Sequence, residues 1–299
     1  MKKKAIVTGG AGFIGSNLVD ALVEKGYEVH VIDDLSAGKK EHVNAQVTLH
    51  VVDIRDLERI KPIFEGGSYV FHFAALPRVQ YSIEHPVETS DVNIIGTLNV
   101  LEASRAAQVQ RVVYSASSSA YGDQPVMPLV ETMPASPKSP YGLQKYIGEL
   151  YCRTWSEVYG LPTVSLRYFN VYGPRQSSEG AYALVIAHFL KQKRQGQPMT
   201  ITGDGEQTRD FTHVSDVVRA NILAAESPNV GKGEALNIGG GRSVSVNEIA
   251  RLIDGPSIHV PARLEPRNTL ADTSLAKRLL GWEASVVFEE GLARLLEAE

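Results

Sequence analysis

The sequence predicts an α/β protein: a doubly wound parallel sheet with a second, smaller α/β lobe. Three observations support this fold class. Strand-like and helix-like segments alternate through the first half of the chain, a glycine-rich turn follows the first strand, and short elements separated by glycines take over after about Tyr168. Such alternation is typical of right-handed crossover connections, which build a parallel sheet covered by helices on both faces.

Apolar, β-branched runs mark the expected strands, and apolar residues spaced by three and four mark the expected helices. The strands are Lys4–Thr8, Glu28–Ile32, Val47–Val52, Tyr69–Phe73, Arg111–Ser115 and Thr163–Tyr168. The helices between them are Ile14–Lys25, Leu57–Phe64, Val92–Ala107 and Tyr141–Tyr159. The strands are almost entirely apolar, as burial on both faces of a sheet requires.

The second part of the chain supplies further helices and suggests a division into two lobes. Helices are expected near Ala183–Gln195, Val214–Ala225, Val246–Leu252 and Glu289–Leu296. We assign residues 1–168 and 211–238 to the sheet domain and residues 169–210 and 239–299 to the smaller lobe. Ligands of open α/β sheets bind beyond the carboxyl ends of the strands, so the smaller lobe is expected to cover that crevice.

Composition and charge exclude several classes of protein. The 299 residues are 43% hydrophobic with a formal net charge of −4, so no basic surplus indicates a nucleic-acid partner. The single cysteine, Cys152, excludes an internal disulfide and fits a reducing compartment. The histidines show no metal-ligand spacing, no apolar run is long enough for a membrane span, and glycines follow too soon after MKKKAIVT for a signal peptide. We therefore expect a cytoplasmic protein without a metal ion.

A glycine array lies between the first strand and the first helix. Gly9, Gly12 and Gly15 form GxxGxxG, with Phe13 and Ile14 in the same turn. Glycines allow a tight turn and let backbone N–H groups approach a pyrophosphate at the helix N-terminus, where partial positive charge gathers. The array predicts a dinucleotide site, although the same glycines also suit an ordinary strand-to-helix turn.

Carboxylates at the ends of the next two strands fit the rest of a dinucleotide. Asp33, followed by Asp34, ends the second strand, where an acid accepts hydrogen bonds from a ribose 2′-hydroxyl and repels a 2′-phosphate. This favours NAD over NADP, and the alternative is a solvated acid in a turn. Asp53 follows the third strand and fits an adenine edge, or else the N-cap of a helix that begins at Arg55.

A tyrosine and a lysine share one face at the start of a long helix. Tyr141 and Lys145 are four residues apart. A phenol with a pKa of about 10 is a poor base at pH 7, but a neighbouring ammonium and a positively charged nicotinamide would both lower that pKa. Ser117 follows the fifth strand in a hydroxyl-rich run and is placed to orient a substrate hydroxyl. The alternatives are a core tyrosine beside a surface lysine, and a merely polar loop.

These motifs, in this order and spacing, resemble those of the extended short-chain dehydrogenases/reductases. More narrowly, the chain is similar to the NAD-dependent nucleotide-sugar epimerases of the UDP-glucose 4-epimerase type. The resemblance runs nearly end to end, through TGGAGFIGSNLV, DDLSAGK, NIIGTLNVLEA, YSASSSAYGD, SPYGLQK, LRYFNVYGPR, GDGEQTRDFTHVSD, LNIGGG and LADTSLAKRLLGW. It implies a Rossmann-type sheet, NAD as the cofactor, and a smaller lobe that binds a UDP-sugar.

The resemblance also implies a role for each matching residue. Tyr141 is the general base, Lys145 its electrostatic partner and a ligand of the nicotinamide ribose, and Ser117 the residue that binds the substrate hydroxyl. The implied cofactor contacts are Gly9, Gly12, Phe13, Ile14, Asp33, Asp34, Leu35, Ser36, Gly38, Asp53, Ile54, Phe73, Ala74, Ala75, Asn93, Ser115, Tyr141, Lys145 and Tyr168. The implied substrate contacts are Ser117, Asn170, Arg209, Glu265, Arg267 and Thr269.

The implied reaction is the interconversion of UDP-glucose and UDP-galactose through a 4-keto sugar, with NAD recycled. Dehydratase and decarboxylase relatives carry an acid between the hydroxyl residue and the following Tyr-Gly pair. The run Ser117–Tyr121 has none, which counts against water elimination. The open alternatives are a UDP-glucuronate epimerase or decarboxylase, a dehydratase, a 4-ketosugar reductase and a non-catalytic NAD sensor.

Near the C-terminus the sequence departs from the family pattern. Arg263 and Arg267 both fit the arginine that faces the diphosphate, and Glu265 fits the acid that holds the uridine ribose. Thr269 matches the residue that limits the size of the sugar pocket. A small residue there leaves room for an N-acetyl group, so UDP-GlcNAc and UDP-GalNAc are implied as further substrates.

The resemblance further implies a homodimer. The helices Val92–Ala107 and Tyr141–Tyr159 resemble the pair that packs into a four-helix bundle between subunits of relatives. Their apolar residues fit such an interface or an ordinary core: Ile94, Leu98, Leu101, Leu150 and Trp155.

Overall fold

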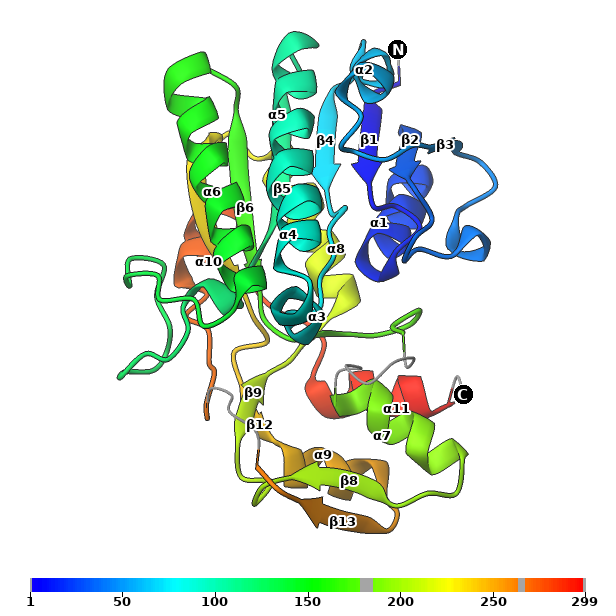
Figure 1. Ribbon diagram of the computed structural model, residues 1–299, viewed down its shortest axis with the longest axis vertical. Coiled ribbons are helices and arrows are strands. Elements are labelled where there is room, and N and C mark those ends of the chain that lie inside the picture. Colours follow the sequence, from blue (N-terminus) through cyan, green and yellow to red (C-terminus); the bar gives the residue numbers. More distant parts are fainter. Residues whose placement is uncertain (1, 178–184, 263–266, 298–299) are drawn as a thin grey trace.

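The computed structural model describes residues 2–177, 185–262 and 267–297 of the chain. Its centre is a seven-stranded parallel sheet in the order β11-β6-β5-β4-β1-β2-β3 (Figure 1). The strand order reverses between β1 and β4. Ligands of open α/β sheets bind beyond the carboxyl ends of the strands at such a point, and we call this region the crevice. The predicted Rossmann-type class is confirmed. The strands are β1 (Lys4–Thr8), β2 (Glu28–Asp33), β3 (Thr48–Val51), β4 (Tyr69–His72), β5 (Arg111–Ser117), β6 (Thr163–Tyr168) and β11 (Lys232–Ile238).

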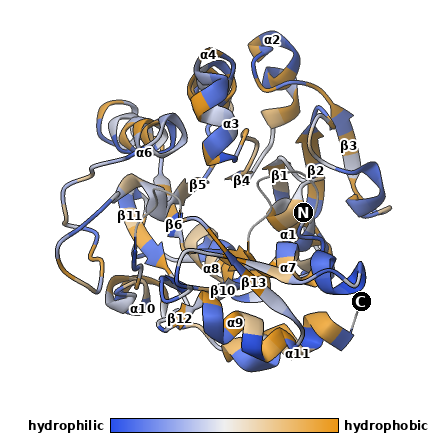
Figure 2. Ribbon diagram, turned by 60° about the horizontal axis from the view of Figure 1, so that its bottom comes forward, coloured by the Kyte–Doolittle hydropathy of each residue, from blue (hydrophilic) through white to orange (hydrophobic). Residues whose placement is uncertain are grey.

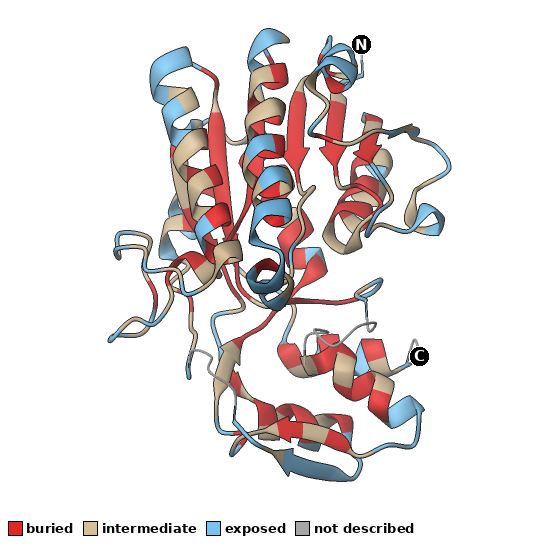
Figure 3. Cartoon of the chain, viewed as in Figure 1, coloured by how far each residue is buried: buried red, intermediate tan, exposed pale blue. Residues whose placement is uncertain are grey.

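Helices cover both faces of this sheet because successive side chains of a strand point to opposite faces. In β1, Ala5 and Val7 belong to the core formed with α1 (Phe13–Glu24), α8 (Val214–Glu226) and α10 (Ser274–Leu280). Ile6 faces the other side, toward α2 (Leu57–Ile60), α5 (Thr97–Ala106) and α6 (Pro140–Tyr159). Figure 3 shows buried strands between helices that are exposed on their outer sides.

The smaller lobe lies below the sheet domain in Figure 1, beyond the carboxyl ends of the strands. A separate apolar core, including Phe189, Ile249 and Leu292, holds it together. Figure 2 shows hydrophobic and hydrophilic bands side by side on α9 and α11, as expected of helices that bury one face. Its elements are parallel β8 (Met199–Thr202) and β13 (Ser257–Val260), antiparallel β9 (Thr208–Asp210) and β12 (Ser243–Ser245), α7 (Val185–Arg194), α9 (Val246–Ile253) and α11 (Phe288–Glu297).

Short elements connect these parts. The pair β7 (Val171–Tyr172) and β10 (Thr212–His213) is parallel and lies where the chain passes between the lobes. The remaining helices and single turns are η1 (Lys40–His42), η2 (Lys61–Phe64), α3 (Val79–Glu84), α4 (Pro86–Ser90), the π-helical η3 (Asp91–Gly96) and η4 (Ser118–Ala120).

Most predicted elements are present, with small shifts at their ends. The predicted helix Leu57–Phe64 divides into α2 and the 3₁₀ helix η2, which carries Pro62 at its start and so lacks one backbone donor. The predicted helix Val92–Ala107 begins within the π-helical turn η3. The predicted helix from Ala183 is found from Val185, and Ala183 itself lies outside the described residues.

Two features of the second half differ from the prediction. Strand β11 is absent from the predicted set because Gly233 and the polar residues around it interrupt its apolar pattern. The division predicted from the sequence places residues 274–282 in the smaller lobe, but Ala276, Leu280 and Trp282 belong to the core of the sheet domain. Trp282 Nε1 donates to the Asp216 carbonyl of α8 at 2.9 Å, which fixes this segment there. The rest of the division into lobes stays our proposal.

No helix in the described ranges is long and apolar enough to cross a membrane. Within the same ranges, no three or more His, Cys, Asp and Glu side chains are grouped so that they would hold a metal ion.

Candidate active site

The turn between β1 and α1 brings backbone atoms into contact where side chains would not fit. Gly9 has φ +72°, and a Cβ on it would lie 2.6 Å from the backbone nitrogen of Ala74. A Cβ on Gly15 would lie 2.2 Å from the Gly9 carbonyl oxygen. Gly12 precedes the 12-residue helix α1, and no side chain of the described residues caps that N-terminus. The turn therefore presents uncapped N–H groups of Phe13 and Ile14 to an anion.

Asp33 ties this turn to the loop that follows β2. Its side chain is buried, Oδ2 accepts a hydrogen bond from the Ala11 N–H, and Oδ1 accepts one from the Leu35 N–H, both at 2.9 Å. Burial raises the pKa of Asp33, and these two hydrogen bonds oppose the rise. The alternative of a solvated turn acid is therefore wrong for Asp33.

The loop after Asp33 is held close to the glycine turn. A Cβ on Gly38 would lie 2.7 Å from the Ala11 Cβ, so the loop needs glycine here. Asp34 is exposed, and its Oδ1 accepts hydrogen bonds from the Ser36 N–H at 3.0 Å and the Ser36 hydroxyl at 2.6 Å. This loop lies at the crevice, and contacts of its residues with the cofactor stay predictions.

Asp53 forms a turn with Arg55 after β3. Its Oδ1 accepts a hydrogen bond from the Arg55 N–H at 2.8 Å, and its Oδ2 pairs with the Arg55 guanidinium at 2.6 Å. The hydrogen bonds from Arg55 lower the pKa of Asp53 although partial burial opposes this. Helix α2 begins at Leu57, and its N-cap is Asp56, so the N-cap alternative for Asp53 is wrong. Contacts of Asp53 and the buried Ile54 with adenine stay predictions.

The loop after β4 closes the floor of the crevice. The Ala74 N–H donates to the Thr8 carbonyl at 3.1 Å, which explains the close approach to Gly9. Asn93 clamps the same loop: its Oδ1 accepts from the Leu76 N–H at 2.8 Å, and its Nδ2 donates to the Leu76 carbonyl at 3.1 Å. Asn93 thus positions this loop through the protein, and its contact with the cofactor, like those of Phe73 and Ala75, stays a prediction.

Ser117, Tyr141 and Lys145 come together at the carboxyl end of β5. Ser117 ends the strand, and its hydroxyl is hydrogen-bonded to the Tyr141 phenol. Lys145 is 4% exposed, and its Nζ donates to the Ser115 carbonyl at 2.8 Å and lies 5.1 Å from the centre of the Tyr114 ring. The three residues that the sequence singles out are therefore neighbours.

The predicted lowering of the Tyr141 pKa is not produced by the protein's own groups. Burial raises the pKa of Tyr141, and the hydrogen bond with Ser117 opposes this rise only in part. Burial also lowers the pKa of Lys145 to about 8. In the protein without its cofactor, desolvation disfavours the charged forms of both Tyr141 and Lys145. The predicted lowering of the Tyr141 pKa includes the charge of a bound nicotinamide, so it stays a prediction.

Residues that the sequence analysis passes over position the start of α6. Ser139 is the N-cap and accepts from the Gly142 N–H at 3.1 Å. The Tyr141 N–H donates to the Ser82 hydroxyl at 3.0 Å, and Gln144 is buried and accepts from Asn93 Nδ2 at 2.8 Å. The sequence SPYGLQK could have predicted this cap, because a serine followed by a proline is typical of a helix N-terminus.

Tyr168, at the end of β6, is the register partner of Ser117 at the end of β5. Its ring stacks with that of Phe73 at 6.4 Å between centres, and its hydroxyl donates to Asn221 Oδ1 at 3.0 Å. Burial raises the pKa of Tyr168 well above its ordinary value, so its hydroxyl stays protonated. These two predicted cofactor contacts are brought together by the sheet.

Three predicted substrate contacts gather around β9. Asn170 Nδ2 donates to the Asp210 carbonyl at 2.9 Å, and the Asp210 N–H donates to the Thr269 hydroxyl at 3.3 Å. Arg209 Nη1 donates to the Thr208 carbonyl at 2.9 Å and to the Arg267 carbonyl at 3.1 Å. The smaller lobe therefore brings Asn170, Arg209 and Thr269 into one region, far apart as they are in sequence.

Arg267 itself points elsewhere. Its side chain is 66% exposed and pairs with Asp204 Oδ2 at 2.8 Å. A role of Arg267 in binding the diphosphate stays a prediction. Glu265 and Arg263 lie outside the described residues.

Asp210 is a structural acid that the sequence analysis does not single out. It has no exposed surface, and it accepts hydrogen bonds from the N–H groups of Gly240 at 2.6 Å, Gly241 at 3.2 Å and Ala271 at 3.0 Å. Burial raises the pKa of Asp210 to about 6, although these hydrogen bonds oppose the rise. Asp210 thus joins β9, the loop after β11 and the segment that carries Thr269.

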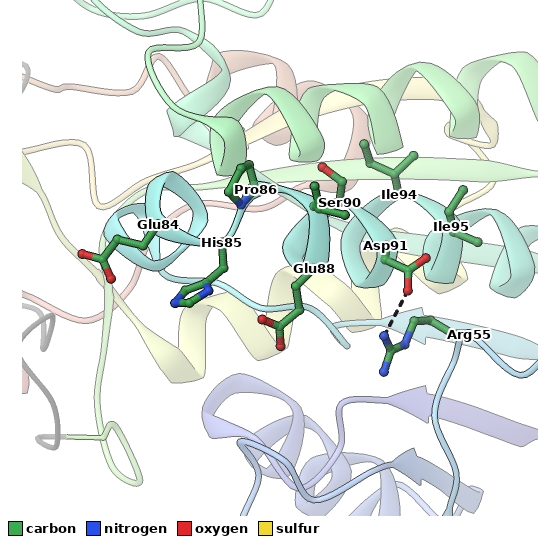
Figure 4. A pocket seen from close by; sticks show the side chains of 10 residues that line it. Arg55, Glu84, His85, Pro86, Glu88, Ser90, Asp91, Ile94 and Ile95 are labelled. Atoms are coloured by element: carbon green, nitrogen blue, oxygen red, sulfur yellow. Dashed lines mark hydrogen bonds and ion pairs between the residues drawn. The ribbon is translucent and has the colours of Figure 1, made fainter.

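A pocket of about 730 Å³ opens beside the loop that carries Asp53 and Ile54 (Figure 4). The side chains of His85 and Glu88 project from α4 and the turn before it, and Arg55 reaches across to Asp91 at 3.0 Å. None of Ser117, Tyr141 and Lys145 lines this pocket, so it is separate from the site that these three residues form. The lining residues are Arg55, Glu84, His85, Pro86, Val87, Glu88, Ser90, Asp91, Ile94 and Ile95.

A family model described as the NAD dependent epimerase/dehydratase family matches residues 5–239, which span the glycine turn, the Asp33 loop and the Ser117–Tyr141–Lys145 group. The chain belongs to this family. Its cofactor is NAD.

Relatives match over almost the whole chain. The UDP-glucose 4-epimerase of Mycolicibacterium smegmatis is 36% identical over 98% of this chain and 97% of its own. A solved UDP-glucose 4-epimerase from Thermotoga maritima is 42% identical, with a TM-score of 0.94 over 98% of this chain and 97% of that one. A UDP-N-acetylglucosamine 4-epimerase from Methanobrevibacter ruminantium is 37% identical, with a TM-score of 0.94 over 99% and 98%. A UDP-N-acetyl-alpha-D-glucosaminuronate decarboxylase of Bacillus cytotoxicus also matches, at 32% identity over 99% and 98%.

The residues of the crevice fit NAD. The uncapped N-terminus of α1 suits a pyrophosphate, and the clash that any Cβ at Gly9 or Gly15 would cause keeps this turn clear of side chains. The buried carboxylate of Asp33 ends β2, and a carboxylate at this place in the fold would accept from a ribose hydroxyl and repel a 2′-phosphate. Lys145 is buried near the carboxyl end of β5, where its Nζ donates to the Ser115 carbonyl.

Proposed function

We propose that this NAD-dependent enzyme is a UDP-hexose 4-epimerase that interconverts UDP-glucose and UDP-galactose. The observation that carries the proposal is the grouping of Ser117, Tyr141 and Lys145 at the carboxyl end of β5, beside the NAD crevice. The similarity to named 4-epimerases over nearly the full chain supports it.

Inversion at C4 requires a proton and a hydride to leave and return. When bound in the crevice, NAD would supply the hydride acceptor and donor for this exchange. Tyr141 takes the proton of the C4 hydroxyl and returns it, and Ser117 orients that hydroxyl by the hydrogen bond it shares with the phenol. Lys145 Nζ donates to the Ser115 carbonyl, two residues before Ser117, and we propose that its positive charge favours the phenolate form of Tyr141 when NAD is bound.

The smaller lobe holds the nucleotide while the sugar turns over. Arg209 on β9 supplies a guanidinium suited to diphosphate oxygens. Asn170 is hydrogen-bonded to the same strand through the Asp210 carbonyl. The 4-keto sugar then rotates about its link to the diphosphate, so that hydride returns to the opposite face. This division requires firm contacts to UDP and few contacts to the hexose.

The absence of an acid in Ser117–Tyr121 separates this proposal from dehydration and decarboxylation. Elimination of water needs a general acid at that place, and the side chains there are hydroxyl, methyl and phenol groups. The competing activities are those of a UDP-glucuronate epimerase or decarboxylase, a dehydratase and a 4-ketosugar reductase. Because one relative is named as a decarboxylase of a UDP-sugar, the experiment below also looks for a decarboxylated product.

The purified protein is expected to contain NAD and to interconvert UDP-glucose and UDP-galactose without added cofactor. A panel of UDP-sugars, including the N-acetylated and glucuronate forms, is separated by chromatography after incubation in deuterated water. The expected product carries no deuterium at C4, because the hydride moves only between carbon and nicotinamide. Deuterium at C4, a decarboxylated or dehydrated product, or stoichiometric consumption of NADH would each overturn the proposal.

We further propose that the enzyme accepts UDP-GlcNAc and UDP-GalNAc, because Thr269 is small and lies beside the other substrate residues. The substitution Thr269→Tyr is expected to lower turnover of the acetylated pair at least tenfold relative to the plain pair. An unchanged ratio between the two pairs would show that Thr269 does not limit the pocket.

We also propose a homodimer that works in the cytoplasm and pairs through α5 and α6. Leu101 is fully buried, so it belongs to the core of the subunit, and Trp155 packs against that core too. Ile95, in the η3 turn directly before α5, and Leu143, on α6, are 44% and 48% exposed, and α5 and α6 lie next to each other in Figure 1. Exposed apolar groups along this helix pair support an interface with a second copy.

A further inference from the structure

We infer that Asp20 is a positioning residue that couples NAD binding to binding of the sugar nucleotide. Asp20 lies on α1, two turns after the glycine turn, and its two carboxylate oxygens contact two different segments. Oδ1 accepts a hydrogen bond from Asn44 Nδ2 at 2.8 Å, and Oδ2 pairs with Arg175 Nη2 at 2.7 Å. One side chain on the cofactor helix thus joins the loop after β2 to the segment after β7.

The first of these segments belongs to the NAD site. Asn44 lies in the segment between β2 and β3, which also includes Leu35, Ser36 and Gly38, the predicted contacts of the adenosine ribose. Asn44 is itself held in place, because its Oδ1 accepts from the Gln46 N–H at 2.9 Å. The same loop is joined to the glycine turn by the Lys39 N–H, which donates to the Ala11 carbonyl at 3.0 Å. Ordering of this loop around a ribose therefore affects the position of Asp20.

The second segment leads into the smaller lobe. Arg175 follows Asn170, which contacts β9, and precedes α7 along the chain. Arg175 has φ 70°, a left-handed conformation that costs an ordinary residue about 1 kcal/mol and persists only where contacts hold it. One such contact is the pair with Asp20, and another comes from Asn17 on the same face of α1, whose Nδ2 donates to the Pro174 carbonyl at 3.1 Å.

Through these contacts, Asp20 links the NAD site to the proposed sugar-nucleotide site. The Asp20 and Arg175 side chains are 31% and 32% exposed, so water screens the pair and its strength depends on how well both segments are ordered. A ligand that orders one segment lowers the entropy cost of ordering the other, which is positive coupling between the two sites. By linkage, UDP then strengthens NAD binding by the same factor by which NAD strengthens UDP binding.

The test measures this factor directly and rests on the proposed UDP-sugar site. Bound NAD is removed, and the dissociation constant of NAD is then measured by titration with and without saturating UDP. The wild type, Asp20→Ala and Arg175→Gln are compared. The wild type is expected to bind NAD at least about fivefold more tightly with UDP, and both variants are expected to show a factor within about twofold of one. Glu24→Gln, an exposed acid one turn further along α1, is the matched control and is expected to keep the wild-type factor.

Each outcome decides the matter. A wild-type factor near one, or an unchanged factor in both variants, would overturn the coupling role while leaving the proposed function intact. Failure of the wild type to bind UDP at all would overturn the proposed function and the coupling with it. Weaker NAD binding in the variants with an unchanged factor would show that Asp20 only stabilises the loop. Thermal unfolding of each variant verifies that it is folded, and Arg175→Gln tests the pair without altering α1.

Discussion

Burial sets the proton affinities of the individual residues around the crevice. Desolvation raises the pKa of Tyr141 and lowers that of Lys145 to about 8, so the protein alone disfavours both the phenolate and the ammonium. Without bound ligands, the Tyr141 phenol therefore stays protonated at neutral pH. If Tyr141 is the base, as we propose, the positive charge of oxidised NAD is needed to favour its phenolate form.

Removal of the Tyr141 hydroxyl tests its role most directly. Tyr141→Phe is expected to lower kcat by about two to four orders of magnitude, the usual contribution of a general base. The free energy of unfolding should change little, since the ring remains in place. Tyr146→Phe, a half-buried tyrosine on the same helix, is the control and should keep nearly full activity. Equal kcat values for the two variants would remove Tyr141 from the reaction.

His72 makes the fold sensitive to acid. It is 2% exposed and bonded to the hydroxyls of Thr8 at 2.7 Å and Thr97 at 2.9 Å, and burial lowers its pKa to about 3. The folded state therefore binds fewer protons than the unfolded state between about pH 3 and 6.5, so stability is lost as the pH falls through this window. At pH 5 the loss from His72 is about 2 kcal/mol relative to neutral pH.

Urea unfolding at pH 7.5 and pH 5 measures this contribution. The variant His72→Gln is expected to be less stable than the wild type at pH 7.5 but to lose about 2 kcal/mol less on acidification. Parallel losses in the two proteins would show that other groups, such as paired carboxylates, account for the acid sensitivity.

At the scale of elements, a buried ion pair fixes α6 to the sheet. Arg167 on β6 meets Glu149 on α6 through two hydrogen bonds of 2.6 and 2.9 Å, with both side chains 5% exposed. The guanidinium also lies 4.6 Å from the centre of the Tyr121 ring, in the loop that follows Ser117. Helix α6, which carries Tyr141 and Lys145, and the loop that carries Tyr121 are thus held by one arginine.

Breaking this pair should be costly because it leaves a buried charge without a partner. Glu149→Gln is expected to destabilise the protein by about 3 to 5 kcal/mol, measured by urea unfolding. Glu157→Gln, exposed on the same helix, should change the stability by less than about 0.5 kcal/mol. The double variant Glu149→Met with Arg167→Met should recover much of the loss. Similar small effects for both single variants would show that the pair is not coupled to folding.

At the scale of the whole molecule, the exposed apolar stripe of α6 predicts the assembly. Leu143 and Val158 are 48% and 64% exposed at opposite ends of this 20-residue helix. The wild type is expected to sediment as a dimer at micromolar concentrations, and the double variant Leu143→Glu with Val158→Glu as a monomer, because each charge would be buried unpaired. Val126→Glu, on an equally exposed loop residue, should remain dimeric. A monomeric wild type would contradict the proposed dimer.

The parts of the site that depend on the spacing of neighbouring residues could be predicted from the sequence. Glycines at a strand-to-helix turn, an acid at the end of β2, and a tyrosine four residues before a lysine each require only a few neighbouring positions. The structure places them at one edge of the sheet because parallel strands bring their carboxyl ends together. Strand β11 could not be predicted the same way, since it gains its place by pairing with β6 rather than from its own apolar pattern.

Tertiary structure alone decided the contacts between residues distant in sequence and the charges that depend on them. The carboxylate of Asp210 joins glycines and an alanine from two later segments, Asp20 meets Arg175 more than 150 residues further on, and the amide of Asn93 holds a loop rather than facing solvent. The direction of the Tyr141 pKa was likewise decided by burial. Such properties depend on which surfaces lose water when the lobes form, and residue spacing carries no information about that.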